Sequence, residues 1–379
     1  MKIAMIGQKG VPATYGGPER HVEELGRRLV AMGHEVSVYV RPYYGQTAQE
    51  GGFLKEYLGM RLYTLPSIRT KHLDAISHTF LSTFHAIPRG MDIVHFHAQG
   101  PSTAAWLSRV GRSRTVATVH GLDWQREKWG RLASAYLKLG EISSARWVDG
   151  TICVSRTMTR YYEERFGIHP AYIPNGIRMP GEVGSARITS QWGLERGGYY
   201  LFLARLVPEK GCHYLIQSFR RLKTNRKLVI TGGGVYTDAY VQRLRSLAGD
   251  DPRILFTGYQ YGEVLEELYA NAYLYILPSE LEGLPITLLE AMSHATPALV
   301  SDIPENLEVL DGVEAPTGRV GLTFPQGSEE GLGERLAWAE GHPEELLAMG
   351  RGGRERVSSA YDWDQIARQT ADFYAKIAR

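Results

Sequence analysis

The chain has 379 residues, 43% hydrophobic and 22% charged, an ordinary globular mixture that excludes wholesale disorder and fibrous repeats. Its 43 basic and 41 acidic residues give a net charge of +2, which is too balanced for a general nucleic-acid binder. No apolar run approaches the ~20 residues of a membrane span, and Met1–Gly7 is too short for a signal peptide. Cys153 and Cys212 have no metal or redox spacing, so we predict a cytoplasmic protein of two domains without disulfides or structural zinc.

In the first half of the chain, short β-rich runs alternate with helical patterns, which is typical of βαβ units and parallel sheets. The strand-like runs are residues 2–7, 35–40, 60–65, 92–98, 115–120, 151–155 and 171–174. The helix expected at Glu19–Met32 carries Val22, Leu25 and Leu29 on one stripe, with charges elsewhere. A first Rossmann-like domain is therefore predicted over residues 1–180.

The same pattern restarts in the second half, after a turn-rich stretch at 180–186 that we interpret as a linker. Strands are expected at 199–204, 227–231, 253–257, 273–277, 297–301 and 320–324, and helices at 212–222, 238–248, 262–271 and 286–294. A second Rossmann-like domain is predicted over 181–362, and residues 363–379 form a helix that either caps it or crosses back onto the first domain. The predicted fold class is α/β, with two doubly wound domains facing each other across a cleft and ligands beyond the carboxyl ends of the strands.

A glycine-rich loop, residues 7–17, separates the first strand from the first helix. Gly16 and Gly17 would let a ligand approach the backbone closely, and the helix N-terminus favours an anion. The loop lacks the G-x-G-x-x-G dinucleotide fingerprint and the G-K-[ST] ending of a P-loop, which disfavours a Rossmann oxidoreductase. The loop either borders a phosphate site or is a surface turn that needs glycines only for its shape.

Charged residues follow the strands of the second half. Arg205 and Lys210 are five residues apart and can grip a diphosphate, the first as a fork and the second as a point charge. Gly232 follows the next strand, where its backbone can approach the same ligand. Glu282 and Glu290 are eight residues apart, which on a helix is ~12 Å along the axis, too far for the carboxyl pair of a glycosidase. The pair instead suits two carboxylates that bind different hydroxyl groups of one extended ligand.

These residues in combination resemble the donor site of retaining family-four glycosyltransferases of the GT-B fold, and the resemblance runs through almost the whole chain. Pro174–Gly176 matches the family's segment near the domain junction. The first half of the chain is similar to bacterial rhamnosyltransferase-type members, and the residues that carry this similarity are 10–19, 68–74 and 120–124. Those proteins build surface glycans, usually on a lipid-linked acceptor. Many of them carry Asp where His120 stands and Glu where Asp123 stands, which leaves the transferred sugar open.

The resemblance implies a role for each donor-site residue. Arg205 and Lys210 would stabilise the leaving nucleoside diphosphate, Glu290 would hold the ribose hydroxyls, and Glu282 would contact the donor sugar. The further residues it implies at the donor are His120 beside the reacting sugar, Gly16 and Gly17 at the diphosphate, and Gly232, Gly283, Leu284 and Pro285. No cofactor is expected, and a UDP- or dTDP-sugar is favoured over a GDP-sugar as donor.

Polar residues of the first domain are candidates for the acceptor side. His95 and His97 alternate at a strand end and should point to one face, but no third ligand follows at a recognisable spacing. We therefore interpret His97 as a wall of the acceptor cleft and expect no metal. The expected reaction does not require a protein base, and Glu19 and Asp123 are the alternative candidates for one. The acceptor-side set is Glu19, Arg69, Lys71, His72, His97, Asp123 and Trp124.

Basic and aromatic residues at 69–72 and from Trp124 onward suggest recognition of a lipid diphosphate or an anionic membrane surface, although each residue alone also fits an ordinary solvated charge. The predicted function is metal-independent, retaining transfer of a hexosyl or rhamnosyl group from a nucleoside-diphosphate sugar to a lipid-linked glycan in bacterial surface polysaccharide synthesis. The alternatives are a sugar-nucleotide epimerase on the same fold and a non-catalytic nucleotide-sugar or glycan-binding protein. The expected location is the cytoplasm, with peripheral association at the inner face of the plasma membrane left open.

Overall fold

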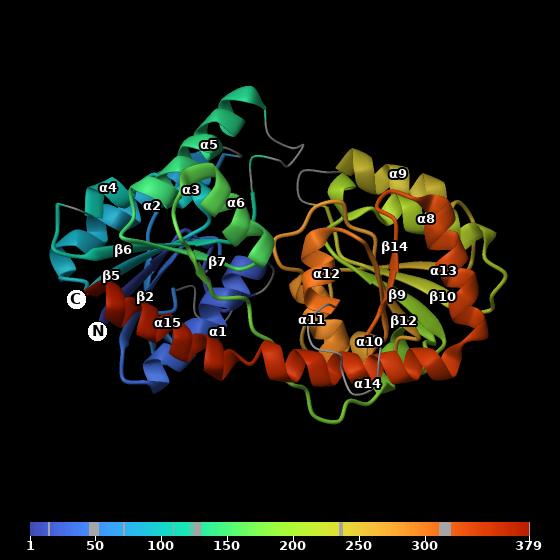
Figure 1. Cartoon of the computed structure of the whole chain (residues 1–379). Coiled ribbons are helices and arrows are strands. Elements are labelled where there is room, and N and C mark those ends of the chain that lie inside the picture. The colour runs from blue at the N-terminus through green and yellow to red at the C-terminus, as the bar shows by residue number, and fades with distance from the viewer. Residues whose placement is uncertain are drawn as a thin grey trace. The chain divides into compact units, whose positions relative to one another are not determined.

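The computed structural model describes residues 1–13, 16–44, 53–70, 73–108, 110–122, 124, 130–234, 238–310 and 320–378 (Figure 1). The contacts within the chain divide it into two compact units. Unit 1 is Met1–Gly176 together with Trp363–Arg379, and unit 2 is Ile177–Asp362. The first boundary lies a few residues before the one expected at 180/181, and the C-terminal helix belongs to unit 1.

Unit 1 is built on a sheet whose strands lie in the order β3-β4-β2-β1-β5-β6-β7-β8. The strands are β1 Lys2–Ile6, β2 Glu35–Val40, β3 Glu56–Tyr57, β4 Met60–Thr64, β5 Ile93–His97, β6 Arg114–Val119, β7 Gly150–Cys153 and β8 Ala171–Tyr172. Every neighbouring pair is parallel except β3 and β4. The carboxyl ends of β1, β5 and β6 therefore lie next to one another at one edge of the sheet.

Helices cover both faces of this sheet. They are α1 Gly17–Ala31, α2 Leu73–Ala86, η1 Ile87–Arg89, α3 Gln99–Ser102, α4 Ala105–Ser108, α5 Arg131–Arg146, α6 Arg156–Phe166 and α15 Trp363–Ala378. Alternate residues of β1 enter two separate cores: Ile3 and Met5 pack with α1 and α15, whereas Ala4 and Ile6 pack with α2 and α4. A strand that is buried on both faces in this way is the mark of a doubly wound sheet.

The last helix, α15, is held on unit 1 by its apolar face and by one ion pair. Trp363, Ile366 and Tyr374 are buried in the same core as α1. At the edge of this contact, Arg28 Nε lies 2.5 Å from the Asp364 carboxylate. Of the two positions that the sequence leaves open for this helix, the structure has the one on unit 1.

Unit 2 contains a fully parallel sheet in the order β11-β10-β9-β12-β13-β14. Its strands are β9 Tyr199–Leu203, β10 Lys227–Thr231, β11 Ile254–Gly258, β12 Leu274–Leu277, β13 Ala298–Ser301 and β14 Leu322–Phe324. Its helices are α7 Ala186–Trp192, η3 Pro208–Lys210, α8 Cys212–Arg221, α9 Asp238–Ala248, α10 Gly262–Ala270, α11 Ile286–Ser293, α12 Pro304–Leu310, α13 Glu329–Gly341 and α14 Pro343–Ala360. Helices α8, α9 and α13 share a buried core with β9, and α11 packs on β12, β13 and α14.

The predicted α/β class with two Rossmann-like domains is confirmed, because both units have mostly parallel sheets with helices around them. The segments that carry the predicted site residues follow β1, β4, β5 and β6 in unit 1 and β9, β10 and β12 in unit 2. Within the described residues, the helices all fall short of the length and apolar character that a membrane crossing needs.

Candidate functional site

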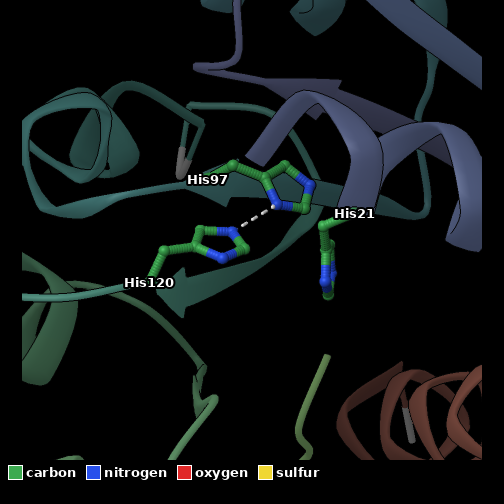
Figure 2. A group of neighbouring side chains, drawn as sticks. All are labelled: His21, His97 and His120. Carbon is green, nitrogen blue, oxygen red and sulfur yellow. Dashed lines mark hydrogen bonds between the residues drawn. The ribbon is translucent and has the colours of Figure 1, made fainter. Parts of the chain in front are cut away.

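Three histidines meet at the carboxyl edge of the unit 1 sheet, and we call them the imidazole cluster (Figure 2). His97 is the last residue of β5, His120 follows the last residue of β6, and His21 lies near the start of α1. One ring nitrogen of each lies within 4.8 Å of the other two, and the ring centroids are 4.9–5.6 Å apart. His97 Nδ1 and His120 Nε2 are 3.3 Å apart. The sequence predicted His97 and His120 for the site, and the structure brings them together with a third ring that it did not predict.

One histidine of the cluster is fixed by a hydrogen bond, and another has a ring nitrogen without a partner among the described residues. His21 Nδ1 lies 2.9 Å from the side-chain oxygen of Asn175. His97 is fully buried, and its Nε2 atom has no hydrogen-bond partner in the part of the chain that the structure describes. Asn175 belongs to the Pro174–Gly176 segment, so that segment orients a site residue.

His95 lies against the cluster but is not part of it. Its ring stacks near that of His97, with 4.1 Å between centroids, as the strand alternation predicts. Both of its nitrogens are bonded, Nδ1 to the Tyr374 hydroxyl at 2.6 Å and Nε2 to the Thr118 hydroxyl at 2.7 Å. His95 therefore connects the sheet to α15 and offers no nitrogen to a ligand.

Burial keeps the imidazole cluster uncharged. Desolvation lowers the pKa of His21 to about 4, and its hydrogen bond to Asn175 only partly opposes this. Desolvation and repulsion from neighbouring histidines hold the pKa of His97 and of His120 well below the usual range. Near neutral pH the cluster therefore offers neutral donors and acceptors, which suit hydroxyl groups or a metal ion better than an anion.

The glycine loop of unit 1 is tied to helix α1 by acidic side chains. Gly16 has φ 103°, a left-handed conformation, and a Cβ there would overlap the Glu19 carboxylate. The buried Glu19 carboxylate accepts a hydrogen bond from the Lys9 backbone N–H at 2.9 Å. Glu23 accepts one from the Ala13 N–H at 2.6 Å. These bonds give Glu19 a structural function in shaping the loop, beside the acceptor-side role that the sequence assigns to it.

The other acceptor-side candidates have neighbours of their own. Arg69 is exposed, with its guanidinium 5.0 Å from the centre of the Tyr43 ring. Trp124 Nε1 donates to the Glu141 carboxylate at 3.3 Å, and Lys138 lies over the Trp124 ring. Lys71, His72 and Asp123 lie outside the described residues, so their predicted roles stay predictions.

Unit 2 has a charged pair where unit 1 has neutral rings. Lys210, at the end of η3, forms an ion pair with Glu282 in the loop between β12 and α11. The Ser279 hydroxyl donates to the same Glu282 oxygen at 2.7 Å. Only 13% of the Lys210 side chain and 9% of the Glu282 side chain are exposed, so each ion depends on the other. Two residues that the sequence assigns to the donor from different loops thus share one location.

The backbone around this pair is closely packed. Gly232 has φ 135°, and a Cβ there would overlap the carbonyl oxygen of Ala204, the residue before the half-buried Arg205. The loops after β9 and β10 therefore touch, which brings Arg205 and Gly232 to the same end of the sheet. Gly283, Leu284 and Pro285 lead directly into α11, whose N-cap is Pro285. The structure thus gathers the donor residues predicted in the loops of unit 2 at the carboxyl ends of β9, β10 and β12.

Glu290 lies further along α11 and is nearly buried, with 8% exposed. The Tyr269 hydroxyl donates to its Oε2 atom at 2.8 Å, a contact that fixes the carboxylate. A third carboxyl group, Glu305 on α12, was not predicted. Burial, with smaller contributions from Glu282 and Glu308, raises the pKa of Glu305 to about 6. Sequence patterns do not reveal Tyr269 or Glu305, because both act through burial by distant segments.

One D-x-D triplet, a pattern that can hold a divalent ion, occurs at Asp362–Asp364. Its central residue, Trp363, is buried in the core of unit 1, and the Asp364 carboxylate is paired with Arg28. This pairing lowers the pKa of Asp364. The triplet therefore joins α15 to α1 and does not form an open metal site.

Two family descriptions match the chain: "Glycosyltransferase Family 4" over residues 15–179 and "Glycosyl transferases group 1" over residues 187–356. Together they span most of both units. The chain therefore belongs to the GT-B glycosyltransferases of group 1 and family 4.

Similar proteins agree with this assignment. A GDP-mannose-dependent α-(1-6)-phosphatidylinositol monomannoside mannosyltransferase of Mycobacterium tuberculosis (strain CDC 1551 / Oshkosh) is 27% identical over 402 residues, covering 98% of each chain. Sucrose-phosphate synthase of Thermosynechococcus elongatus has a TM-score of 0.81 at 21% identity, over 99% of this chain and 98% of that one. HepE of Anabaena, solved with UDP-glucose, has a TM-score of 0.80 at 16% identity, over 99% and 100%. At such identities the two structures show the fold alone.

Proposed function

We propose that this glycosyltransferase moves a hexosyl or rhamnosyl group from a UDP- or dTDP-sugar to a lipid-linked glycan acceptor in bacterial surface polysaccharide synthesis. The transfer retains the anomeric configuration and needs no metal ion. The observation that carries this proposal is the buried Lys210–Glu282 pair at the carboxyl edge of the unit 2 sheet, on the same side as Arg205 and Glu290. A cation able to bind a diphosphate lies there beside a carboxylate able to accept hydrogen bonds from hydroxyl groups, which supports the proposal.

The donor is assigned to unit 2. Lys210 leaves Glu282 for the diphosphate, and together with Arg205 it offsets the negative charge that develops as the sugar departs. Glu282, still bonded to Ser279, is then able to accept hydrogen bonds from sugar hydroxyls. Glu290, fixed by Tyr269, accepts hydrogen bonds from the ribose. Lys210 thus has an anionic partner at both stages, while Glu282 keeps its hydrogen bond from Ser279 and gains those of the sugar hydroxyls.

The reacting sugar is assigned to His120 of the imidazole cluster. A sugar that loses its leaving group acquires positive, oxocarbenium-like charge. A nearby imidazolium would oppose that charge, whereas burial keeps His120 neutral through its lowered pKa. The departing phosphate oxygen takes the acceptor's proton, so no protein nucleophile or base is required, and attack on the same face retains the configuration.

Nucleotide release from a panel of donors tests the proposal. UDP-, dTDP- and GDP-sugars are each incubated with and without a lipid-linked sugar acceptor, and the anomer of any product is assigned by NMR. Acceptor-dependent release of UDP or dTDP with a retained anomer is expected. The name of the mycobacterial relative indicates a GDP-mannose donor for that enzyme. If this chain released nucleotide from GDP-sugars and from neither UDP- nor dTDP-sugars, the proposed nucleobase of the donor would be overturned. Donor turnover without acceptor indicates an epimerase, and tight nucleotide binding without turnover of any donor indicates a binding protein.

We further propose that unit 1 associates with an anionic membrane surface. Leu73, Leu81 and Phe84 share one face of α2 by their spacing, and they are 45%, 39% and 56% exposed. Ile68 is 54% exposed and the adjacent Arg69 is exposed as well, and Arg89 is exposed beyond the other end of α2. Apolar side chains next to arginines complement an anionic bilayer interface.

Co-sedimentation with vesicles checks this association. Binding should be stronger to vesicles that contain phosphatidylglycerol than to pure phosphatidylcholine, and both Phe84→Ser and Arg69→Ala should weaken it. The matched control is Leu347→Ser, which removes an equally exposed apolar side chain (58%) from unit 2. Equal binding to both kinds of vesicle, unchanged in the two variants, would contradict the proposal.

A further inference from the structure

We propose that the imidazole cluster, His21, His97 and His120, binds one divalent transition-metal ion of the Zn²⁺ class. The three rings come from α1, β5 and the end of β6, and Figure 2 shows them as neighbours, with the bond between His97 and His120 dashed. Nothing in the reaction proposed above uses His21 or requires three imidazoles together. The metal site is therefore an addition to that reaction.

The spacing of the rings suits a tetrahedral ion. Zinc binds imidazole nitrogen at about 2.0–2.1 Å, so two ligands of a tetrahedral site lie about 3.3 Å from each other. His97 Nδ1 and His120 Nε2 are already 3.3 Å apart. One nitrogen of the His21 ring lies within 4.8 Å of one nitrogen of each of the other two rings, so all three can bind one ion if the His21 ring moves closer.

The hydrogen bonds around the cluster favour a ligand as well. The Asn175 oxygen accepts a hydrogen bond from His21 Nδ1–H, which leaves Nε2 of that ring as the lone-pair donor; outer-sphere bonds of this kind orient metal-binding histidines. His97 Nε2 is buried without a hydrogen-bond partner among the described residues. The ion would take the other nitrogen of this ring, Nδ1, so Nε2 keeps its proton and is not itself a ligand. His95, with both nitrogens bonded, is excluded as a fourth ligand.

The donor set selects the type of ion. Three imidazoles without a carboxylate suit Zn²⁺, Co²⁺, Ni²⁺ or Cu²⁺, whereas Mg²⁺, Ca²⁺ and Mn²⁺ prefer oxygen ligands. The rings need not lose a proton before binding, because burial already keeps them neutral. The fourth position stays open to water. If the proposed function holds, the ion competes with the sugar for His120 and therefore inhibits transfer reversibly.

Direct binding measurements test the site without donor or acceptor, so that a failure of the proposed sugar transfer does not affect the result. Tag-free protein is stripped with EDTA, desalted and titrated with Zn²⁺ by calorimetry, and the bound metal is counted by mass spectrometry. We expect one equivalent in the wild type, at least a tenfold loss of affinity in His21→Ala and His120→Asn, and a tenfold to hundredfold loss in Asn175→Ala. His169→Ala, which removes an exposed histidine of the same unit, is the matched control and should bind like the wild type.

A second measurement on the wild type keeps the proposal testable if a variant fails to fold. Co²⁺-loaded protein should show the intense visible bands of tetrahedral coordination, and X-ray absorption of Zn²⁺-loaded protein should show imidazole nitrogens at about 2.0–2.1 Å. Absence of stoichiometric binding, an octahedral Co²⁺ spectrum, or full affinity in His21→Ala and His120→Asn would each overturn the proposal.

Discussion

The two units share one plan, a parallel sheet with helices on both faces, and they differ in the charge of the side chains that follow their strands. In unit 1 the site residues are neutral imidazoles, His21, His97 and His120. In unit 2 they are ions, with Lys210 paired to Glu282. The backbone fold fixes where a ligand can bind, and the residues of the loops decide what kind of ligand it is.

Burial has opposite consequences in the two places. An imidazole can escape the cost of burial by losing its proton, and the histidines of unit 1 do so, as their lowered pKa values show. Lys210 and Glu282 instead meet this cost through each other and through Ser279. The neutral edge suits a sugar and its developing positive charge, and the charged edge suits a diphosphate.

The largest difference between the units should be the loss of folding stability in acid, measured in EDTA so that no metal ion occupies the imidazole cluster. Burial lowers the pKa of His21 and of His78 to about 4, and holds those of His95, His97 and His120 well below their usual range. The unfolded chain binds these protons near pH 6.5, so between about pH 6.5 and 4 acidification favours unfolding. Each such histidine costs up to about 1.4 kcal/mol of stability per pH unit.

Unit 2 should respond less, because two of its groups act in opposite directions. Burial lowers the pKa of His294 to about 4, so protonation of His294 makes unit 2 less stable on acidification, as in unit 1. Glu305 has its pKa raised to about 6, so the stability it contributes is present at low pH and is lost as the pH rises through that value. Hydrogen exchange of β5 and β9 amides across this pH range separates the units. His78→Leu should reduce the slope for unit 1, and the control His169→Ala should not; equal slopes for both units would refute the difference.

Removal of a cation from unit 2 should have the next largest effect, and it acts on turnover. Lys210→Ala or Arg205→Ala should lower kcat by about 10²–10³-fold, as for the loss of one donor to a developing anion. In Lys210→Ala the buried Glu282 also loses its counter-ion. Lys223→Ala, which removes an exposed lysine of the same unit, is the control and should leave kcat unchanged. Turnover that survives within about threefold in both site variants would disprove the diphosphate assignment.

Much of the fold could be predicted from periodicity. Val22, Leu25 and Leu29, the predicted stripe of the first helix, are all fully buried, and the main strands lie where the apolar runs are. The two-residue strand β3 and the short helices α3 and α4 were not predicted, because so few residues show no period. The position of α15 could not be predicted either, since an amphipathic stripe shows which face is buried but not against what.

The site could be predicted where a residue directly follows a strand and not where it comes from elsewhere. His97 ends β5, His120 follows β6, and Arg205 and Lys210 lie in the segment after β9. His21 lies on a helix beside Val22, where a histidine cannot be distinguished from a core residue by spacing. Tyr269 and Glu305 acquire their importance from burial and from contacts with α11 and its preceding loop, which no local pattern contains.

A smaller effect, on nucleotide affinity, should distinguish Glu290 from the cations. If Glu290 binds the ribose as proposed, Glu290→Gln removes a charged acceptor and should raise the nucleotide Kd by about ten- to hundredfold, equivalent to about 1.5–3 kcal/mol. Tyr269→Phe removes only the bond that fixes the carboxylate and should cost about 1 kcal/mol. Calorimetry with the free nucleoside diphosphate measures both changes. An unchanged Kd in Glu290→Gln would exclude the ribose role.

The smallest expected effect is that of metal removal, because the two units give a metal ion opposite parts. In unit 2, the roles proposed for Arg205 and Lys210 supply the positive charge that a divalent ion would otherwise bring, so we expect transfer to continue at the same rate in EDTA. In unit 1, an ion on the imidazole cluster occupies His120, so added Zn²⁺ should slow transfer and EDTA should restore it. The D-x-D triplet offers no substitute, since Asp364 is paired with Arg28. A loss of activity in EDTA that Mg²⁺ or Mn²⁺ reverses would show that the cations of unit 2 are insufficient on their own.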